Sequence, residues 1–219
     1  MKKTVVIILA FFLLAVASFS ARLLKISADN IVSSSERTKL TGNVYIEKEE
    51  EFTVVTDEAT LTMSDGEWRY LDTSGLTHII FSTGEATGMR LNYDINSSEG
   101  TLHDNVVANI TTEDEQNIII RRAEKIEFKL EEEYYKGNSL PKSHKDFSPI
   151  IILYKGDMEA RALFFEYFAN EDKFHLKDDV FVLDKKNNRE IDASELWYNT
   201  QDDSFEGNNV QLQITLEED

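Results

Sequence analysis

Histidines and paired carboxylates are the side chains of this sequence that could bind a metal or move protons. The four histidines are His78, His103, His144 and His175. No two of them have the spacing of a metal-binding motif, and His103 and His175 are predicted at turn or edge positions of the surface. The acid pairs Asp178-Asp179 and Asp202-Asp203 could supply oxygen ligands for Ca²⁺. Both pairs lie in polar segments that read as turns or bends, so turn geometry accounts for them without a metal.

Other chemical motifs are missing from the sequence. The chain has no cysteine, which excludes disulfides, zinc–thiolate sites and thiol nucleophiles. It contains no phosphate-binding glycine loop, nucleophile elbow or HExxH helix motif. Nothing distinguishes any one carboxylate pair among the 41 acidic residues as a glycosidase dyad. We therefore assign no catalytic residue, no metal ligand and no cofactor, and predict that the protein is not an enzyme.

The charge balance narrows the possible partners. The formal net charge is −18, from 41 acidic and 23 basic residues. Such a surface repels nucleic acid, because phosphate binding requires a basic patch. Both signs of charge are interspersed along the chain, which is typical of a solvated outer face.

The first residues indicate export. Lys2 and Lys3 precede Val5–Ala17, an uninterrupted apolar run of 13 residues, and small residues follow at Ala15–Ala17 and Ser18–Ser20. A membrane-spanning helix needs ~20 apolar residues, so residues 1–21 are predicted to be a cleaved signal peptide. A retained membrane anchor is the alternative. No cysteine follows the run, which excludes a lipoprotein anchor.

The rest of the chain alternates between apolar and polar residues, as β-strands with one dry and one wet face do. Polar turn clusters separate the alternating runs, and no segment has a convincing helical period. The clearest runs are Val44–Ile46, Phe52–Val54, Met89–Tyr93, Ile126–Leu130 and Val210–Ile214. The only two prolines, Pro141 and Pro149, fall in one polar stretch, which predicts a loop or insertion over residues 136–149.

Two short signatures repeat through these strands. In the first, an alanine that is predicted to open a strand is followed three places later by an apolar residue; its copies begin at Ala28, Ala86, Ala123, Ala160 and Ala193, with Ala59 as a weaker copy. The second places Gly, Asn or Asp just before a valine, at Leu40–Val44, Leu102–Val106, Leu176–Val180 and Phe205–Val210. Gly, Asn and Asp tolerate positive φ, so the second signature predicts a bulge or corner inside a strand.

These repeats predict an all-β fold. A single strand pair is marginal in water, but stacked pairs bury a shared face. We expect an elongated, folded-over antiparallel sheet with one continuous dry interior, preceded by the N-terminal hydrophobic segment. Residues 22–135 form its main part, and residues 150–219 either continue the same repeat or form a second lobe.

The repeated segments resemble the OstA/LptA family of lipopolysaccharide-transport proteins, which includes LptC and the periplasmic part of LptD. The resemblance rests on Ala28-Asp29 followed by Leu40–Ile46, on Gly84–Met89 after Thr77–Phe81, and on Leu102–Val106 followed by Ala123. It covers about residues 26–130 in the family's order. The chain differs from the family in the insertion at 136–149 and in its acidity, which does not favour recognition of phosphorylated head groups.

The resemblance implies a V-shaped or taco-like β-jellyroll in the periplasm, with an apolar groove that holds the acyl chains of lipid A. It also implies other Lpt-type β-jellyroll proteins as partners and head-to-tail stacking of copies. Groove candidates are apolar residues on the dry face of the alternating runs. They are Val44, Ile46, Phe52, Val54, Ile79, Phe81, Leu91, Tyr93, Val106, Ile118 and Ile120. Ordinary core packing is the other interpretation of the same residues, and of Phe165, Tyr167 and Tyr198, which fall at equivalent repeat positions.

The leading hypothesis is thus a periplasmic lipid-binding bridge protein that carries lipopolysaccharide toward the outer membrane. An LptC-like adaptor anchored in the inner membrane through residues 1–21 is one alternative. A structural, self-assembling envelope protein without a lipid ligand is another. A polysaccharide-binding module would need exposed aromatic platforms, for which Trp68 and Trp197 are the candidates.

Overall fold

The computed structural model describes residues 23–112, 116–139 and 151–215, which are almost entirely β-structure. The predicted signal segment and residues 140–149 of the predicted insertion lie outside this part. Apart from the strands, one short 3₁₀ helix occurs within the described ranges, at Ala169–Glu171. No helix in the described residues is long and apolar enough to cross a bilayer. The all-β prediction is confirmed.

The sheet contains eighteen strands. In chain order they are β1 (Leu24–Ser27), β2 (Asn30–Ser33), β3 (Arg37–Lys48), β4 (Phe52–Ser64), β5 (Glu67–Ser74), β6 (Thr77–Phe81), β7 (Gly84–Gly88), β8 (Arg90–Asp94), β9 (Glu99–Thr111), β10 (Asn117–Lys129), β11 (Tyr134–Asn138), β12 (Ile151–Lys155), β13 (Met158–Ala162), β14 (Phe164–Phe168), β15 (Lys173–Asp184), β16 (Arg189–Asn199), β17 (Phe205–Asn208) and β18 (Gln211–Ile214).

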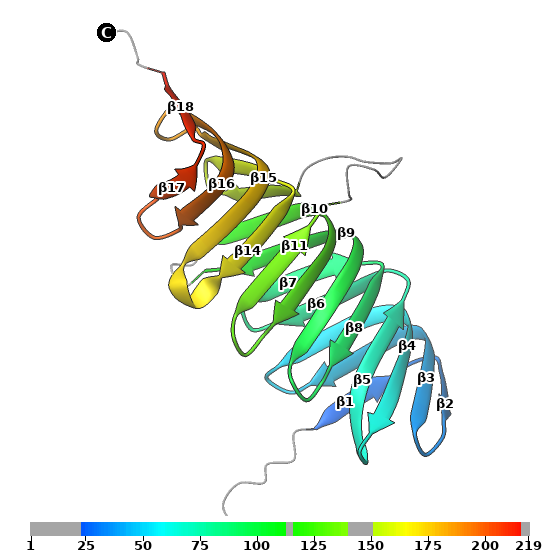
Figure 1. Cartoon of the computed structure of the whole chain (residues 1–219). Coiled ribbons are helices and arrows are strands. Elements are labelled where there is room, and N and C mark those ends of the chain that lie inside the picture. Colours follow the sequence, from blue (N-terminus) through cyan, green and yellow to red (C-terminus); the bar gives the residue numbers. More distant parts are fainter. Residues whose placement is uncertain (1–22, 113–115, 140–150, 216–219) are drawn as a thin grey trace, which may run out of the picture.

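The strands form two walls that share every long strand. Wall 1 contains β1, β6, β7, β12, β13 and β18, and wall 2 contains β2, β5, β8, β11, β14 and β17. The long strands β3, β4, β9, β10, β15 and β16 bend at a corner and contribute one half to each wall. All pairings are antiparallel, and the stack runs from β1 and β2 at one end to β17 and β18 at the other (Figure 1).

The corners contain the residues with positive φ that the sequence predicts. Gly42 and Asn43 have φ of 76° and 45°, and the β3–β4 ladder shifts register between Thr41 and Val44. Each such pair inserts one extra residue, a bulge that turns the strand from one wall into the other. The equivalent positive-φ residues are Asp104 and Asn105 in β9, Asp178 and Asp179 in β15, and Asn209 between β17 and β18.

The alanine signatures lie at the same corners in the neighbouring strands, so the prediction that each opens a strand is wrong. Ala123 and Ala193 are inside β10 and β16. Backbone hydrogen bonds join the two kinds of corner: the Met89 N–H donates to the His103 carbonyl at 2.8 Å. Each corner is therefore a hydrogen-bonded pair of bends, one at an alanine signature and one at a Gly, Asn or Asp.

Strand pairing within each wall continues past the predicted insertion. β11 extends to Asn138, so the first residues of the predicted 136–149 segment are in a strand. β10 pairs with both β11 and β12, and β11 pairs with β14. Strands from both sides of the insertion therefore belong to one sheet.

Substitution of Gly42 tests how much the corner geometry contributes to stability. A Cβ at Gly42 would lie 2.5 Å from Asp29 Oδ2, whereas one at Gly66, whose φ is also positive, would meet nothing within 4 Å. We expect Gly42→Ala to lower the free energy of unfolding by about 2–3 kcal/mol and Gly66→Ala by about 1 kcal/mol. Urea denaturation of both variants measures the difference. Equal losses would contradict a tight corner at Gly42.

Candidate functional site

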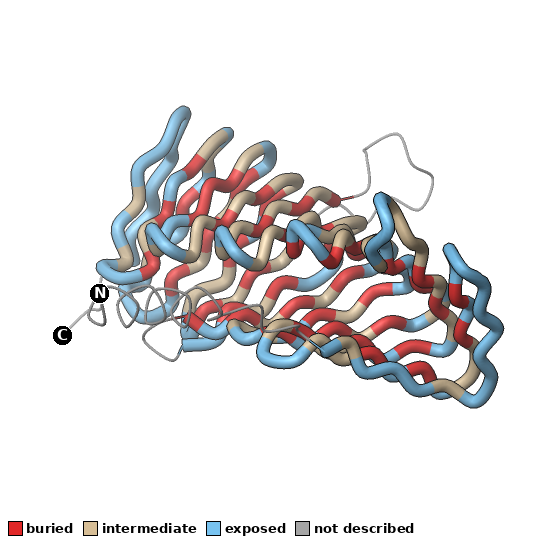
Figure 2. The backbone as a smooth tube through the Cα atoms, turned by 90° about the horizontal axis from the view of Figure 1, so that it is seen from below, coloured by how far each residue is buried: buried red, intermediate tan, exposed pale blue. Residues whose placement is uncertain are grey.

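The space between the two walls is the candidate site, because strand alternation directs the apolar side chains there. In β10, Ile118 and Ile120 are buried whereas Ile119 between them is only partly buried. All eleven predicted groove residues are buried, with 0–7% of their surface exposed. Buried residues recur in strand after strand, while exposed residues gather at the turns and the two ends (Figure 2).

Wall 2 contributes a row of aromatic rings to this interior. The row follows the cross-strand register near the turns and contains Tyr93, Phe128, Tyr135, Tyr167, Phe174, Tyr198 and Phe205. Gly100 lies in the same row between Tyr93 and Phe128, and a Cβ there would be 2.4 Å from Phe128 Cζ. The two rings thus occupy the space that a side chain at residue 100 would need.

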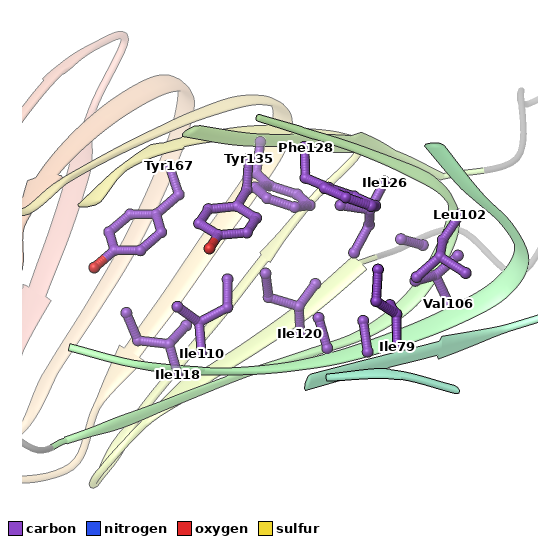
Figure 3. Close-up of a cluster of buried hydrophobic side chains, with 14 of the residues drawn as sticks. Ile79, Leu102, Val106, Ile110, Ile118, Ile120, Ile126, Phe128, Tyr135 and Tyr167 are labelled. Atoms are coloured by element: carbon purple, nitrogen blue, oxygen red, sulfur yellow. The ribbon is translucent and has the colours of Figure 1, made fainter. Parts of the chain in front are cut away.

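Wall 1 faces these rings with aliphatic side chains. Phe128, Tyr135 and Tyr167 extend from one wall toward Ile110, Ile118 and Ile120 of the other (Figure 3). Phe52 and Phe81 of wall 1 also reach across: the Phe52 and Tyr93 ring centroids are 4.8 Å apart, and those of Phe81 and Tyr135 are 6.0 Å apart. A single apolar cluster therefore extends from Leu40 to Tyr198.

This interior is closed in the structure. The apolar space that adjoins Leu153, Ala160 and Phe174 amounts to about 10 Å³, which is at most room for one water molecule. The candidate groove residues thus pack as a core. Occupation by a hydrocarbon chain would require the two walls to separate.

Continuous backbone joins the walls along one side, and the other side, which we call the rim, lacks this connection in the described strands. At the corner side the backbone of each long strand runs from one wall to the other. At the rim, non-covalent contacts join the turns of wall 1 to those of wall 2. Lys48 Nζ donates to the Ile95 carbonyl at 2.8 Å and is 2.6 Å from Glu51 Oε2, and the Ser98 hydroxyl donates to Glu51 at 2.8 Å.

Further rim contacts follow at intervals. The Thr83 hydroxyl and the Tyr135 hydroxyl are 2.9 Å apart near the middle of the molecule. Toward the C-terminus, Lys155 Nζ donates to the Thr200 carbonyl. Between these two contacts the rim has a hollow of about 240 Å³ beside Thr112 and Tyr167. Polar contacts between the turns of the two walls thus recur along the rim in the part of the chain that the structure describes.

The sequence did not indicate a buried polar network on the outer face of wall 2. The prediction of a surface turn or edge for His175 is wrong: it is buried within β15, with Nε2 2.7 Å from Glu195 and Nδ1 3.2 Å from Glu166. Its ring stacks on Trp197 at 3.7 Å between centroids. The alternation places these side chains on one face, which is the only sequence signal that could have found them.

The network affects the ionisation of its acids. Burial opposes ionisation of Glu166, but hydrogen bonds from Tyr134 and His175 outweigh it and hold its pKa below the usual value. Hydrogen bonds from His175 and Asn208 lower the pKa of Glu195. No three His, Asp or Glu side chains in the described residues converge as metal ligands would.

Comparison with known proteins adds one structural likeness. No family model matches the chain, and no curated protein matches it in sequence. Among solved structures it is similar to LptH, the LptA-homologous periplasmic component of the lipopolysaccharide transport device of Pseudomonas aeruginosa, at 10% identity. The match covers 89% of this chain and 96% of LptH with a TM-score of 0.25. A score this low supports no statement about function.

Tyr135 makes the rim sensitive to alkaline pH. Burial raises the pKa of Tyr135 to about 12, although the hydrogen bond with Thr83 opposes the rise. The unfolded value is about 10, so its contribution to stability is complete below pH 10 and is lost as the pH rises to 12, at about 1.4 kcal/mol per pH unit. We expect Tyr135→Phe to be slightly less stable at pH 8, where it lacks the hydrogen bond, and to lose less stability by pH 12.

Thermal unfolding between pH 8 and 12 checks this expectation. Tyr45→Phe is the control, since Tyr45 is exposed on β3. Parallel pH profiles for the wild type and Tyr135→Phe would show that Tyr135 does not titrate in this range.

Proposed function

We propose that this chain is an exported carrier that holds the acyl chains of a lipid between its two walls. The observation that carries the proposal is the single apolar interior, which extends through the stack between two walls whose turns meet at the rim through non-covalent contacts. The cargo would be lipopolysaccharide, with its lipid A chains in the interior and its head outside.

The free energies of lipid burial and of rim opening are compatible with a lipid chain between the walls. Burial of apolar chain is worth roughly 0.8 kcal/mol per CH₂, so a ~12-carbon chain gains on the order of 9 kcal/mol. Each neutral rim hydrogen bond contributes about 1 kcal/mol net, and those to charged groups about 2 kcal/mol. When the walls separate, the acyl chain becomes the apolar neighbour of each wall in place of the other. One or two chains therefore offset the cost of opening the rim.

The outer faces fit transport in water. The net charge is −18, and many of the acidic residues lie in turns, where exposed charges interact weakly and are screened beyond ~8 Å. Carriage would be passive, with movement of the lipid driven by other proteins. Export through residues 1–21 would place the protein in the periplasm, with other Lpt-type β-jellyroll proteins as its neighbours.

The two ends of the stack favour association with similar walls. Ile26 and Ile31 in the first strands, and Leu212 and Ile214 in the last, are inward-register residues that no further described strand covers. A neighbouring sheet added at either edge would bury them and extend the interior. The same ends are compatible with the second candidate, an envelope protein that assembles through its edges without lipid.

An LptC-like adaptor remains the alternative within the same system. It differs in that residues 1–21 would be retained as an inner-membrane anchor. The mass of the protein recovered from cells distinguishes the two, because cleavage removes about 20 residues.

Site-specific photo-crosslinking tests the carrier proposal. Phe81 points into the interior, and its neighbour Ile80 is 42% exposed on the outer face. With benzoylphenylalanine at either position, we expect crosslinks to lipid A from position 81 and few from position 80. Mass spectrometry of the adducts measures the ratio. Equal labelling, or labelling at position 80 alone, would exclude carriage between the walls.

Self-association tests the role of the ends. Leu212 on β18 is 55% exposed, and Leu76, in the bend between β5 and β6, is 62% exposed. We expect Leu212→Asp to weaken association between copies at least tenfold, since it places a charge in the apolar contact. Leu76→Asp should leave it unchanged. Sedimentation equilibrium measures both, and equal behaviour of the two variants would show that β18 is not the contact.

A further inference from the structure

The rim-side inner row of wall 1 changes character along the stack. Its cross-strand register runs from Phe52 through Phe81 and Ile110 to Ile118 with apolar side chains or glycine. Beyond Ile118 the same row continues as Lys155, Met158, Asp184 and Arg189. Lys155 and Asp184 are 7% and 5% exposed. Charged groups thus point inward at both ends of the row, here and at Lys48, whereas the units between them place hydrocarbon or glycine there.

The positive charge of Lys155 is not balanced by a carboxylate of its own. Its Nζ donates to the Thr200 carbonyl, is 3.5 Å from the Tyr198 hydroxyl and is 3.6 Å from Asp203 Oδ1. Asp203 also lies 3.8 Å from Lys186 Nζ. Two ammonium groups therefore share this carboxylate.

Two further carboxylates, those of Asp184 and Asp157, also contribute to this charge balance. Asp184 is bonded by Arg189, so that carboxylate is already neutralised. Asp157 also lines the hollow described next, but it is exposed to solvent. Burial makes an ammonium group costly unless oxygen ligands surround it.

Two spaces meet at Lys155. The outer one is a hollow of about 370 Å³ whose lining includes Lys186 and Asp203. The inner one is the narrow apolar space between Leu153 and Ala160 of wall 1 and Phe174 and Leu176 of wall 2. Lys155, Met158, Tyr198 and Phe205 line both spaces. A polar hollow thus lies directly beside the apolar interior, which is the arrangement that an amphiphile requires.

We propose that this part of the rim binds the anionic head group of an acyl-chain amphiphile, a carboxylate or phosphate, and admits its chain to the interior. The inference rests on the carrier function proposed above and adds to it the position and charge of the head. An oxygen of the head replaces the Thr200 carbonyl as the acceptor for Lys155, and Lys186 faces it from the hollow. The chain then passes between Leu153 and Phe174, which separates the walls from this end.

Charge-assisted hydrogen bonds are about twice as strong as neutral ones, so the exchange of a carbonyl for an anionic oxygen favours the bound state. The site also reconciles an acidic protein with an anionic ligand. Repulsion from the outer faces is screened within ~8 Å, whereas Lys155 acts at contact distance in a poorly solvated position.

Binding of a fluorescent polyene fatty acid and of its methyl ester to the full-length chain tests the site. The two probes share one chain and differ only in head charge. We expect the wild type to bind the acid more tightly than the ester. Lys155→Met should weaken the acid about tenfold and the ester less than twofold, and Lys155→Arg should restore most of the loss.

Two controls separate a head-group site from a simple rim contact. Lys48 is in the same inner row at the other end and also bonds across the rim, so Lys48→Met should change both probes alike. Lys186 is largely exposed, so Lys186→Met should fold normally and weaken the acid about threefold, while the adjacent Lys185→Met should not. Circular dichroism confirms the fold of each variant.

The outcomes distinguish the head-group site from the carrier function on which it rests. If neither probe binds the wild type, the carrier function and the head-group site both fail. If both probes bind equally, or if Lys155→Met and Lys186→Met weaken both alike, the carrier function stands and the head-group site is excluded. Inorganic phosphate should not displace the acid, because it lacks the chain; displacement would indicate a simple anion site and overturn the proposal.

Discussion

The two walls of this molecule depend on long strands that bend at a fixed point and stay within the sheet. Two residues with positive φ, such as Gly42 and Asn43, stand opposite a single residue of the next strand. The bend lets one strand serve two walls, and its repetition in each neighbour aligns the corners along the stack. The chain is thus continuous at the corner, whereas side-chain and backbone contacts between turns join the walls at the rim.

The corner side and the rim join the two walls in different ways. On one side the polypeptide itself holds the walls together; on the other side, contacts such as Thr83–Tyr135 and Lys48–Ile95 do so. Aromatic rings that extend from wall 2 fill the space while the rim is closed. A flat ring can shift against aliphatic neighbours and still touch them, so the same side chains suit both a packed core and a surface for hydrocarbon.

Much of this architecture could be predicted from the sequence, because alternation and turn chemistry are local signals. Leu40, Val44 and Ile46 all face inward, since the bulge in β3 preserves the two-residue phase. In β4 the phase slips by one between Thr56 and Ala59, which is why the alanine signatures resemble strand starts. The rim contacts, the buried His175 and the inward Lys155 could not be predicted, because each depends on strands that are distant in sequence and on side-chain placement.

The order of the strands also determines how such a molecule could form and vary. Each bent strand pairs with the one before it and the one after it, and every pairing joins strands no more than three places apart in the chain. Closure of long loops is therefore not required, and the sheet can grow by successive addition of hairpins from any point. A gene that gains or loses one hairpin would alter the length of the apolar interior while leaving its cross-section unchanged. The length and the cross-section of the interior can thus be selected independently.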